Sequence, residues 1–148
     1  MNPVIDNRKA RHAYEIQDKF HAGLQLTGTE VKAIREGKVS LAESYVFVSS
    51  SGELWVKGMH IAEFSHGSYA NHPPLRERKL LLKKREIEKI VKKLNDKGLT
   101  LIPLKVYFNN KGWCKMDIAI AKGKQMHDKR QALRNREDAR DLREAKRR

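Results

Sequence analysis

A chain of 148 residues is long enough for one domain with a hydrophobic core and short appendages. Its 32 lysine and arginine residues against 18 aspartate and glutamate residues give a net charge of +14, which favours a polyanionic partner, most often nucleic acid. One cysteine excludes an internal disulfide framework, and no apolar run has the length of a signal peptide or a membrane span, so we expect a cytoplasmic protein without a membrane partner.

After a basic arm at residues 1–12, the first predicted element of the domain is a long strand. Apolar and polar residues alternate from Tyr14 to Leu26, and on the apolar face only Asp18 is out of character. Alternation over this length indicates a half-buried strand. A long strand that contains a glycine, here Gly23, usually bends or bulges, as the strands of small barrels must.

A capped helix and a hairpin are expected next. Thr27 and Glu30 have the spacing of a capping box, so a short helix should begin there and end at Gly37. Two segments rich in β-forming residues, 45–48 and 53–61, flank a Ser-Ser-Ser-Gly turn, which is typical of a β-hairpin. Both faces of this hairpin are apolar, and we expect both to be covered.

The C-terminal half predicts one amphipathic helix and a second hairpin. After a loop at 62–75, apolar residues recur at helical spacing near 84–97, and Gly98 can end that helix. The segments 99–108 and 113–121 carry alternating apolar residues on either side of an Asn-Asn-Lys-Gly turn. This pattern again predicts a hairpin.

The second hairpin also indicates the fold class. Pro103 cannot donate a hydrogen bond to a neighbouring strand, so it should lie at an edge or a bulge. Five or six antiparallel strands with a helix before the last hairpin are typical of a small barrel, an architecture that includes the OB-like folds. The residues expected to face the barrel interior are Ile102, Leu104, Val106, Phe108, Met116, Ile118 and Ile120.

The positive charge is concentrated in three segments. Residues 1–12 carry a net charge of +2, residues 76–93 carry nine basic and three acidic residues, and residues 122–148 carry eleven basic and five acidic residues. The rest of the chain is neutral in total. Basic segments of this kind neutralise phosphates, and arginine and histidine also stack on exposed bases. The candidate RNA contacts are Arg8, Lys9, Arg11, His12, Arg76, Arg78 and Lys79.

The C-terminal tail at 123–148 has no sustained apolar stripe. As a helix it would have nothing to bury against a protein core, so we expect it to be disordered in the free protein and to become ordered against phosphates. A solvated, frayed tail is the alternative. The cations that would share one helical face are Lys129, Arg136, Arg140, Arg143 and Arg147.

Catalytic chemistry has little support in the sequence. Phosphate-binding loops, nucleophile elbows and zinc-binding helix motifs are absent. His127 and Asp128 adjoin, but neighbours on a helix point about 100° apart and make a poor catalytic dyad. We therefore expect a protein that is not an enzyme and that uses no cofactor or metal.

Several strings resemble the family of SsrA-binding proteins, also called small protein B or SmpB. The matches run in order from Asn7 to about Arg130, and beyond that only the basic, helix-forming character matches. The strings are Asn7-Arg8-Lys9-Ala10-Arg11-His12, Ala22-Gly23-Leu24, Gly28-Thr29-Glu30-Val31-Lys32, Ser44-Tyr45-Val46, Arg78-Lys79-Leu80-Leu81-Leu82, Ile102-Pro103-Leu104, Ala121-Lys122-Gly123-Lys124 and Asp128-Lys129-Arg130.

The resemblance implies a mainly β fold, a six-stranded antiparallel OB-like barrel over 13–122 with flanking helices. It implies a bacterial trans-translation factor that binds the tRNA-like domain of tmRNA. With elongation factor Tu and GTP, the complex would enter the vacant A site of a stalled 70S ribosome, at the decoding site of 16S rRNA. The tail would become helical in the empty mRNA channel and so sense the vacancy.

Carried over position by position, the family's functional residues fall on both the domain and the tail. Contacts to tmRNA fall on Asn7 and Leu81 and, at the barrel exit, on two basic residues. The motif needed for tagging falls in the tail, and the arginine stripe continues it. The residues are Lys122 and Lys124 at the exit, then His127, Asp128, Lys129, Arg130, Arg136, Arg140 and Arg143.

Two positions depart from the family pattern. His21 stands where the family usually has a glutamate before Ala-Gly, so an acid that contacts RNA is replaced by a side chain able to donate to a phosphate or base. Gln125 stands where the family often has a second lysine.

Three functions remain distinct alternatives. The preferred hypothesis is a non-enzymatic adaptor of ribosome rescue. A ribosomal or ribosome-assembly protein would instead use the same barrel and tail permanently on rRNA, and an RNase or RNA-modifying enzyme would use His12 or His127 in catalysis. Replacing Asp128, Lys129 and Arg130 by alanine separates these alternatives.

Overall fold

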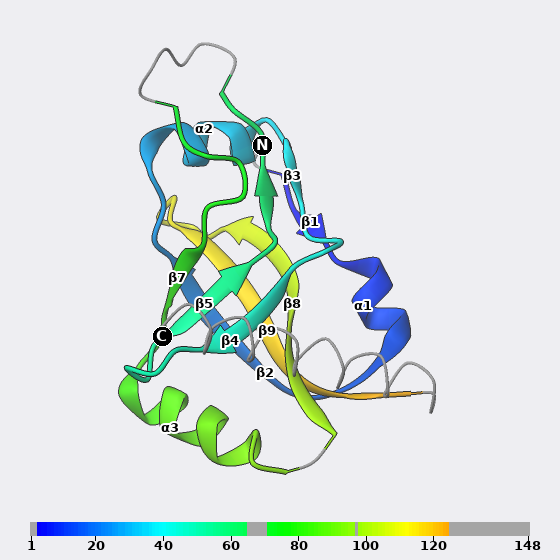
Figure 1. Ribbon diagram of the computed structural model, residues 1–148. Helices are drawn as coiled ribbons and strands as arrows, with labels where there is room; N and C mark the ends of the chain where they lie inside the picture. Colours follow the sequence, from blue (N-terminus) through cyan, green and yellow to red (C-terminus); the bar gives the residue numbers. More distant parts are fainter. Residues whose placement is uncertain (1–2, 65–70, 97, 125–148) are drawn as a thin grey trace, which may run out of the picture.

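The computed structural model describes residues 3–64, 71–96 and 98–124 (Figure 1). The predicted tail from residue 125 onward lies outside this part of the chain. In chain order the elements are β1 (Ile5–Asp6), α1 (Arg8–Ala13), β2 (Tyr14–Leu24), α2 (Gly28–Arg35), β3 (Val39–Ser40), β4 (Tyr45–Val48), β5 (Leu54–Lys57), β6 (His60–Ile61), β7 (Arg78–Leu81), α3 (Lys84–Lys93), β8 (Leu99–Phe108) and β9 (Cys114–Gly123).

Seven of these strands form one antiparallel sheet in the order β1-β8-β9-β2-β7-β5-β4. Because β4 also lies beside β8, the sheet curls into a barrel (Figure 1). The expected mainly β, antiparallel barrel with flanking helices is therefore confirmed. The described residues contain nine strands rather than six, because β1, β3 and β6 are two-residue strands, too short for any alternation to predict.

The expected helices and hairpins are also present. Thr27 caps α2, and the capping box with Glu30 is complete. The first hairpin is formed by β4 and β5, and the second by β8 and β9. α3 ends at Lys93, earlier than the predicted 97, with Leu94 as its C-cap. Gly98, in the turn that follows, has a φ of 88°, a conformation that glycine adopts readily.

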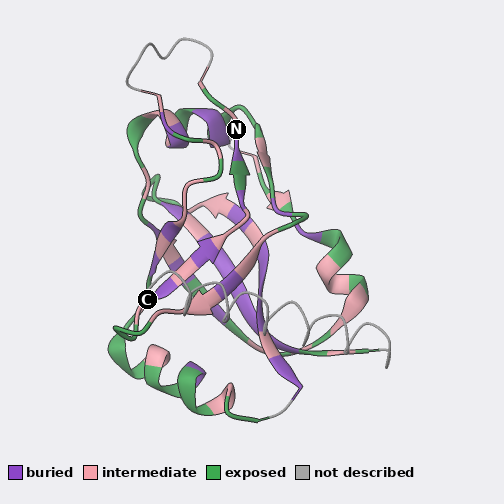
Figure 2. Ribbon diagram, viewed as in Figure 1, coloured by how far each residue is buried: buried purple, intermediate pink, exposed green. Residues whose placement is uncertain are grey.

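The main core fills the barrel, where buried residues line the inner side of the sheet (Figure 2). Phe20 and Ala22 of β2 face Ile118 and Met116 of β9 across the ladder, as the alternation predicts. α3 places Ile90 against the same cluster, while its charged side chains face outward. The packing of the core thus determines which face of each strand points away from the barrel interior.

A second apolar cluster lies on the opposite side of the sheet and corrects part of the prediction. Ile102 and Leu104 belong to it, packed with Ala119 and Ala121, rather than to the barrel interior. The cause is a register shift between Pro103 and Lys105, the bulge expected at Pro103, which inverts the alternation. β2 bulges likewise between Ile16 and Asp18, so Tyr14 and Ile16 also pack in this second cluster.

The basic arm folds onto this second cluster. Ala10 of α1 packs against it, and α1 is seated against the outer side of β2 and β8. Asn7 joins the arm to the barrel: its side chain accepts from the backbone N–H of Ala10 and donates to the carbonyl of Pro103 at 2.9 Å. The arm is therefore part of the folded domain in this structure.

Candidate nucleic-acid interface

The outer face of β7, β2, β9 and β8 remains open beyond the area that α1 covers. Because Ala22, Leu80, Met116 and Val106 point into the barrel, their neighbours in each strand point outward. The cross-strand pairs are Gly23 with Leu81 and Lys115, Lys115 with Tyr107, His21 with Asp117, and Asp117 with Lys105. We call this surface, made of Lys19, His21, Gly23, Leu81, Lys105, Tyr107, Lys115 and Asp117, the outer platform.

Leu81 is the apolar part of the outer platform. It is 50% exposed, whereas Leu80 is 2% exposed and Leu82 packs partly against the core. Opposite it, Gly23 lacks a side chain, and a Cβ there would lie 3.4 Å from the Leu81 Cβ. The structure therefore singles out the predicted leucine of the apolar triplet as the one that can contact a partner.

The polar part of the outer platform is a hydrogen-bonded cluster. The Asp117 carboxylate accepts from the Tyr107 hydroxyl at 2.8 Å and lies 2.6 Å from Nδ1 of His21. The Lys105 ammonium is 3.8 Å from the other carboxylate oxygen. The cluster sits where β2, β9 and β8 run side by side, and burial together with the bond to Asp117 raises the pKa of Tyr107 to about 12.

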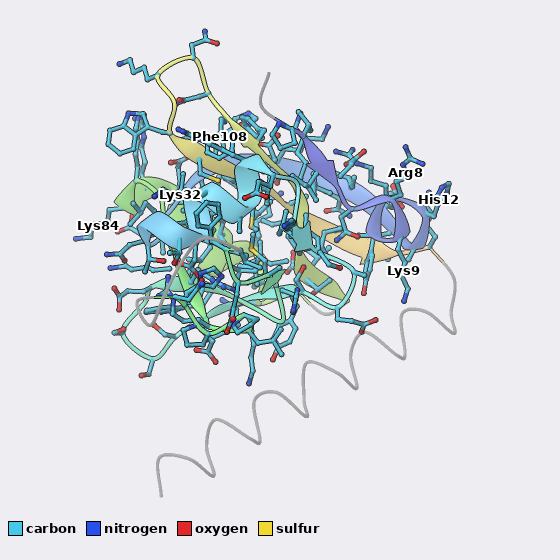
Figure 3. All side chains as sticks on the ribbon, turned by 90° about the horizontal axis from the view of Figure 1, so that it is seen from above. Arg8, Lys9, His12, Lys32, Lys84 and Phe108 are labelled. Carbon is cyan, nitrogen blue, oxygen red and sulfur yellow. The ribbon has the colours of Figure 1, made fainter. Side chains whose placement is uncertain are left out.

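Exposed cations of α1 lie next to the platform on the same side of the barrel. Arg8, Lys9 and His12 are exposed and project from α1 (Figure 3). Arg11 is half-buried and pairs with Asp6 at 2.9 Å. The exposed residues among them are accessible to a phosphate, and their role as phosphate contacts stays a prediction, whereas Asn7 is buried and its amide seats the arm.

The exit of β9 adjoins α1. The Lys124 ammonium lies 3.4 Å from the carbonyl of Arg11, and its backbone N–H donates to Ala13. Lys122 is exposed, and in the ladder it pairs with Glu15. The chain thus leaves the barrel beside the exposed cations of α1. The predicted tail residues His127, Asp128, Lys129, Arg130, Arg136, Arg140 and Arg143 lie outside the described part.

Two of the predicted RNA-binding arginines take part in an internal network with Glu30. Arg78 is 0% exposed, and its guanidinium donates to Glu30 at 2.5 Å and to the carbonyl of Met59 at 2.5 Å. Arg76 donates to the other oxygen of Glu30 at 2.5 Å. In this structure Arg78 therefore has no surface from which to contact a phosphate, whereas Arg76 is partly exposed.

Burial and pairing act in opposite directions on the charges of this network. Burial alone raises the pKa of Glu30, but the hydrogen bonds from Arg76, Thr27 and Arg78 outweigh it and leave the pKa lowered. Burial also lowers the pKa of Arg78, and the bonds to Glu30 partly offset this. Glu30 is thus a buried, ionised carboxylate that ties α2 to β7.

Lys79 and Trp113 are two further groups with access to solvent. Lys79 is half-exposed and forms an ion pair with Glu53 in the turn between β4 and β5. Trp113, the residue before β9, is 68% exposed. In sequence it lies two residues before Lys115 of the outer platform.

Sequence reasoning missed the platform residues from β8 and β9. Lys105, Tyr107, Lys115 and Asp117 are isolated polar residues within two apolar strands, and no motif marks them. The available signal was the alternation itself, because Lys115 and Asp117 interleave with Met116 and Ile118. The residue that lies opposite each of them on the next strand depends on the register, and only the structure gives the register.

Neither a candidate metal site nor a membrane-spanning helix is found among the residues that the structure describes. There, no group of three or more histidine, cysteine, aspartate or glutamate side chains could hold a metal ion. None of the helices within these residues is long and apolar enough to cross a membrane.

Comparisons with known proteins give the family. A profile described as SmpB protein matches residues 4–148. The SsrA-binding protein of Trichormus variabilis is 50% identical over 143 residues, covering 96% of this chain and 91% of that protein. The SsrA-binding protein of Bifidobacterium adolescentis is 50% identical over 139 residues, covering 94% and 87%.

A solved structure agrees with these sequences. A chain described by "tmRNA-SmpB: a journey to the center of the bacterial ribosome" superposes with a TM-score of 0.69 at 46% identity, covering 89% of this chain and 95% of that chain. With the family profile spanning nearly the whole sequence, and with relatives at about half identity, the chain belongs to the SmpB family.

Proposed function

We propose that this protein binds the tRNA-like domain of tmRNA and acts in trans-translation, the rescue of stalled ribosomes. Its relatives are named for binding SsrA, and the similar solved chain is from a tmRNA-SmpB structure. The observation that carries the proposal is the gathering of an exposed leucine, a polar cluster and the cations of α1 on one side of the barrel.

Each part of this side supplies a different component of RNA recognition. Arg8, Lys9 and Lys124 provide mobile charges for phosphates, which supply most of the affinity and make it dependent on salt. Leu81 provides an apolar contact for an unstacked base or ribose, and His21 a polar one. Asn7 acts here by holding α1 on the barrel rather than by touching the RNA itself.

The downstream steps follow from the family resemblance. With elongation factor Tu and GTP bound to the tmRNA, the complex enters the A site of a stalled 70S ribosome, next to the decoding site of 16S rRNA. The tail enters the vacant mRNA channel, with the motif Asp128-Lys129-Arg130 and the arginines beyond it facing rRNA. The adjacency of Lys124 to α1 supports a tail that starts beside the RNA-binding side. The protein acts as a cytoplasmic adaptor and not as an enzyme.

A gel-shift assay with the tRNA-like domain of tmRNA tests the proposal. The protein should bind this RNA tightly in the presence of an ordinary tRNA and of duplex RNA as competitors. Equal displacement by either competitor would refute selective recognition and favour the alternative of a ribosomal or assembly protein on rRNA.

A matched pair of leucine variants locates the interface. Leu81→Ala should weaken RNA binding by about tenfold, the cost of losing one buried apolar side chain at an interface. Leu75→Ala is the control, because Leu75 is 60% exposed but lines a pocket with His60, Pro73 and Arg76 and is not part of the outer platform. Equal effects of the two changes would place the interface elsewhere.

The role of the tail is tested separately. Replacing Asp128, Lys129 and Arg130 by alanine should leave binding to the tRNA-like domain intact and abolish peptide tagging on stalled ribosomes. Loss of RNA binding would contradict the division between domain and tail, and turnover of RNA by the purified protein would favour an enzyme.

A further inference from the structure

The ring of His21 is oriented from beneath by a nearly buried carboxylate. His21 has a side-chain exposure of 66%, whereas the side chain of Asp117 has an exposure of 7%. Nδ1 of His21 lies 2.6 Å from Oδ1 of Asp117, which leaves Nε2 on the solvent side of the ring. One edge of the imidazole is thus committed to the protein, and the other is available to a partner.

The hydrogen bonds of the cluster determine which nitrogen carries the proton. A carboxylate oxygen only accepts, so Nδ1 of His21 must be the donor in its contact with Asp117. Tyr107 donates to the same oxygen, and Lys105 approaches the second one, so Asp117 is held as an acceptor by groups from the neighbouring strand. In the neutral imidazole, Nε2 then has a lone pair and no proton.

From this arrangement we propose that His21 presents a hydrogen-bond acceptor to the RNA, with Asp117 and Tyr107 as positioning residues that fix its tautomer. The inference rests on the proposed function and deepens it by naming the chemistry of the contact: a donor group of the RNA, a ribose 2′-hydroxyl or an exocyclic amino group. It replaces the expectation that His21 donates to a phosphate. Nε2 fills the acceptor role of the family's usual glutamate, although the side chain is chemically different.

The charges around His21 explain how an acceptor and a polyanion coexist here. Lys105 and Lys115 come from β8 and β9, Lys19 from β2, and Asp117 is the acid that faces the ring. The lysines attract the phosphates that flank a contacted nucleotide, while the acceptor selects a donor group within it. Phosphate contacts supply affinity, and the His21 contact supplies selectivity.

Two substitutions at position 21 separate an acceptor from a phosphate contact. In His21→Gln the amide can donate to Asp117 and present its oxygen to the RNA, so affinity for the tRNA-like domain should stay within about threefold of the original. His21→Lys adds a positive charge but has no acceptor, and affinity should fall by about tenfold, the value of one hydrogen bond. Binding by His21→Lys that equals or exceeds that of His21→Gln would overturn the proposal in favour of a phosphate contact.

A double substitution tests the positioning role of Asp117. Asp117→Ala should weaken RNA binding in the original protein but cause little further loss in a His21→Ala background, because Asp117 acts through the ring. Additive losses would overturn this role. Nitrogen NMR of the imidazole measures the tautomer of His21 directly, which a purely structural role of Asp117 would not change. His21 should be the Nδ1–H tautomer in the original protein and should lose that preference in Asp117→Ala.

The source of the donor group is resolved with a modified RNA. In a tRNA-like domain carrying 2′-deoxyribose in its loops, the difference between His21→Gln and His21→Lys should vanish if the donor is a 2′-hydroxyl, and should persist if it is a base amino group. Failure of the original protein to bind the unmodified domain at all would refute the proposed function. Binding with the order of the variants reversed would refute only this inference.

Discussion

Replacing Arg78 by methionine distinguishes a structural arginine from one that binds RNA. The substitution removes the hydrogen bonds from the guanidinium to Glu30, to the carbonyl of Met59 and to the carbonyl of Pro74 at 3.1 Å. It leaves the Glu30 carboxylate, whose side-chain exposure is 0%, with Arg76 as its remaining cation. Removing one partner of a buried ion pair costs about 3–5 kcal/mol, because the other charge stays buried with less compensation.

This loss is a substantial fraction of the total stability of a domain, which is about 5–15 kcal/mol. Thermal unfolding followed by circular dichroism should therefore show Arg78→Met to be strongly destabilised, with a melting temperature lower by roughly 10–20 °C. The double variant Glu30→Gln/Arg78→Met should recover part of the loss, since no fully buried charge remains unpaired and Arg76 is partly exposed. Arg76→Met is the control, and because Arg76 is partly exposed it should cost only about 1 kcal/mol.

Two outcomes would refute this reasoning. If Arg78→Met lost less than about 1 kcal/mol, the network would not contribute to stability as its geometry indicates. If its stability were unchanged and its affinity for the tRNA-like domain fell, Arg78 would have to leave the interior and bind the RNA directly, as the sequence alone suggested.

The remaining predictions concern acid stability, the arm, salt and fluorescence. Because the folded-state pKa of Glu30 lies below its ordinary value of 4.5, its contribution to stability should be complete above about pH 4.5 and be lost as the pH falls through the lowered value; Glu30→Gln should remove this part of the acid dependence measured by unfolding. Asn7→Ala removes the cap of α1 and the hydrogen bond to Pro103, so the backbone amides of α1 should exchange their hydrogens faster. The loss of RNA affinity should be proportional to this release of the arm. If affinity fell while exchange stayed unchanged, Asn7 would be a direct RNA contact. If the cations reach about four to six phosphates, a plot of log affinity against log salt should have a slope of about −3 to −5, and a slope near −1 would mean that the interface is misplaced. Of the two tryptophans, only Trp113 remains in a Trp55→Phe variant, and its fluorescence emission should change when RNA binds. Constant emission would mean that the turn between β8 and β9 lies outside the interface.

The sequence predicted the elements better than it predicted which face each residue joins. The capping box at Thr27 and the second hairpin followed from local spacing, since both depend on residues close in the chain. The alternation in 99–108 was visible, but its phase changes at Pro103, so Leu104 was assigned to the wrong side of the sheet. A proline indicates that a bulge is possible, and only the pairing with β9 shows where the faces invert.

The sequence likewise predicted part of the candidate site and missed the contacts between distant residues. The exposed cations of α1 and Leu81 were named from motifs, and both lie where a partner can reach them. Arg78 was named for its charge, but a basic residue two positions before an apolar run can also face a core, and its partner Glu30 is 48 residues away in sequence. Long-range pairs of this kind have no local signal, and the same holds for His21 with Asp117, which are 96 residues apart.

The two bulges connect the fold to the interface. Had β2 and β8 kept the alternation of the halves that carry Phe20 and Val106, Ile16 and Leu104 would point into the barrel, and the outer face would offer α1 only the small residues Ala119 and Ala121 of β9. The two bulges lie opposite residues 120–121 and 117–118 of β9. On one side of the bulges apolar residues emerge on the outer face and hold the arm, and on the other side His21 and its neighbours stay open. The bulges therefore place the cations of the arm beside the platform on one side of the barrel, and an RNA bound to one of these surfaces can reach the other.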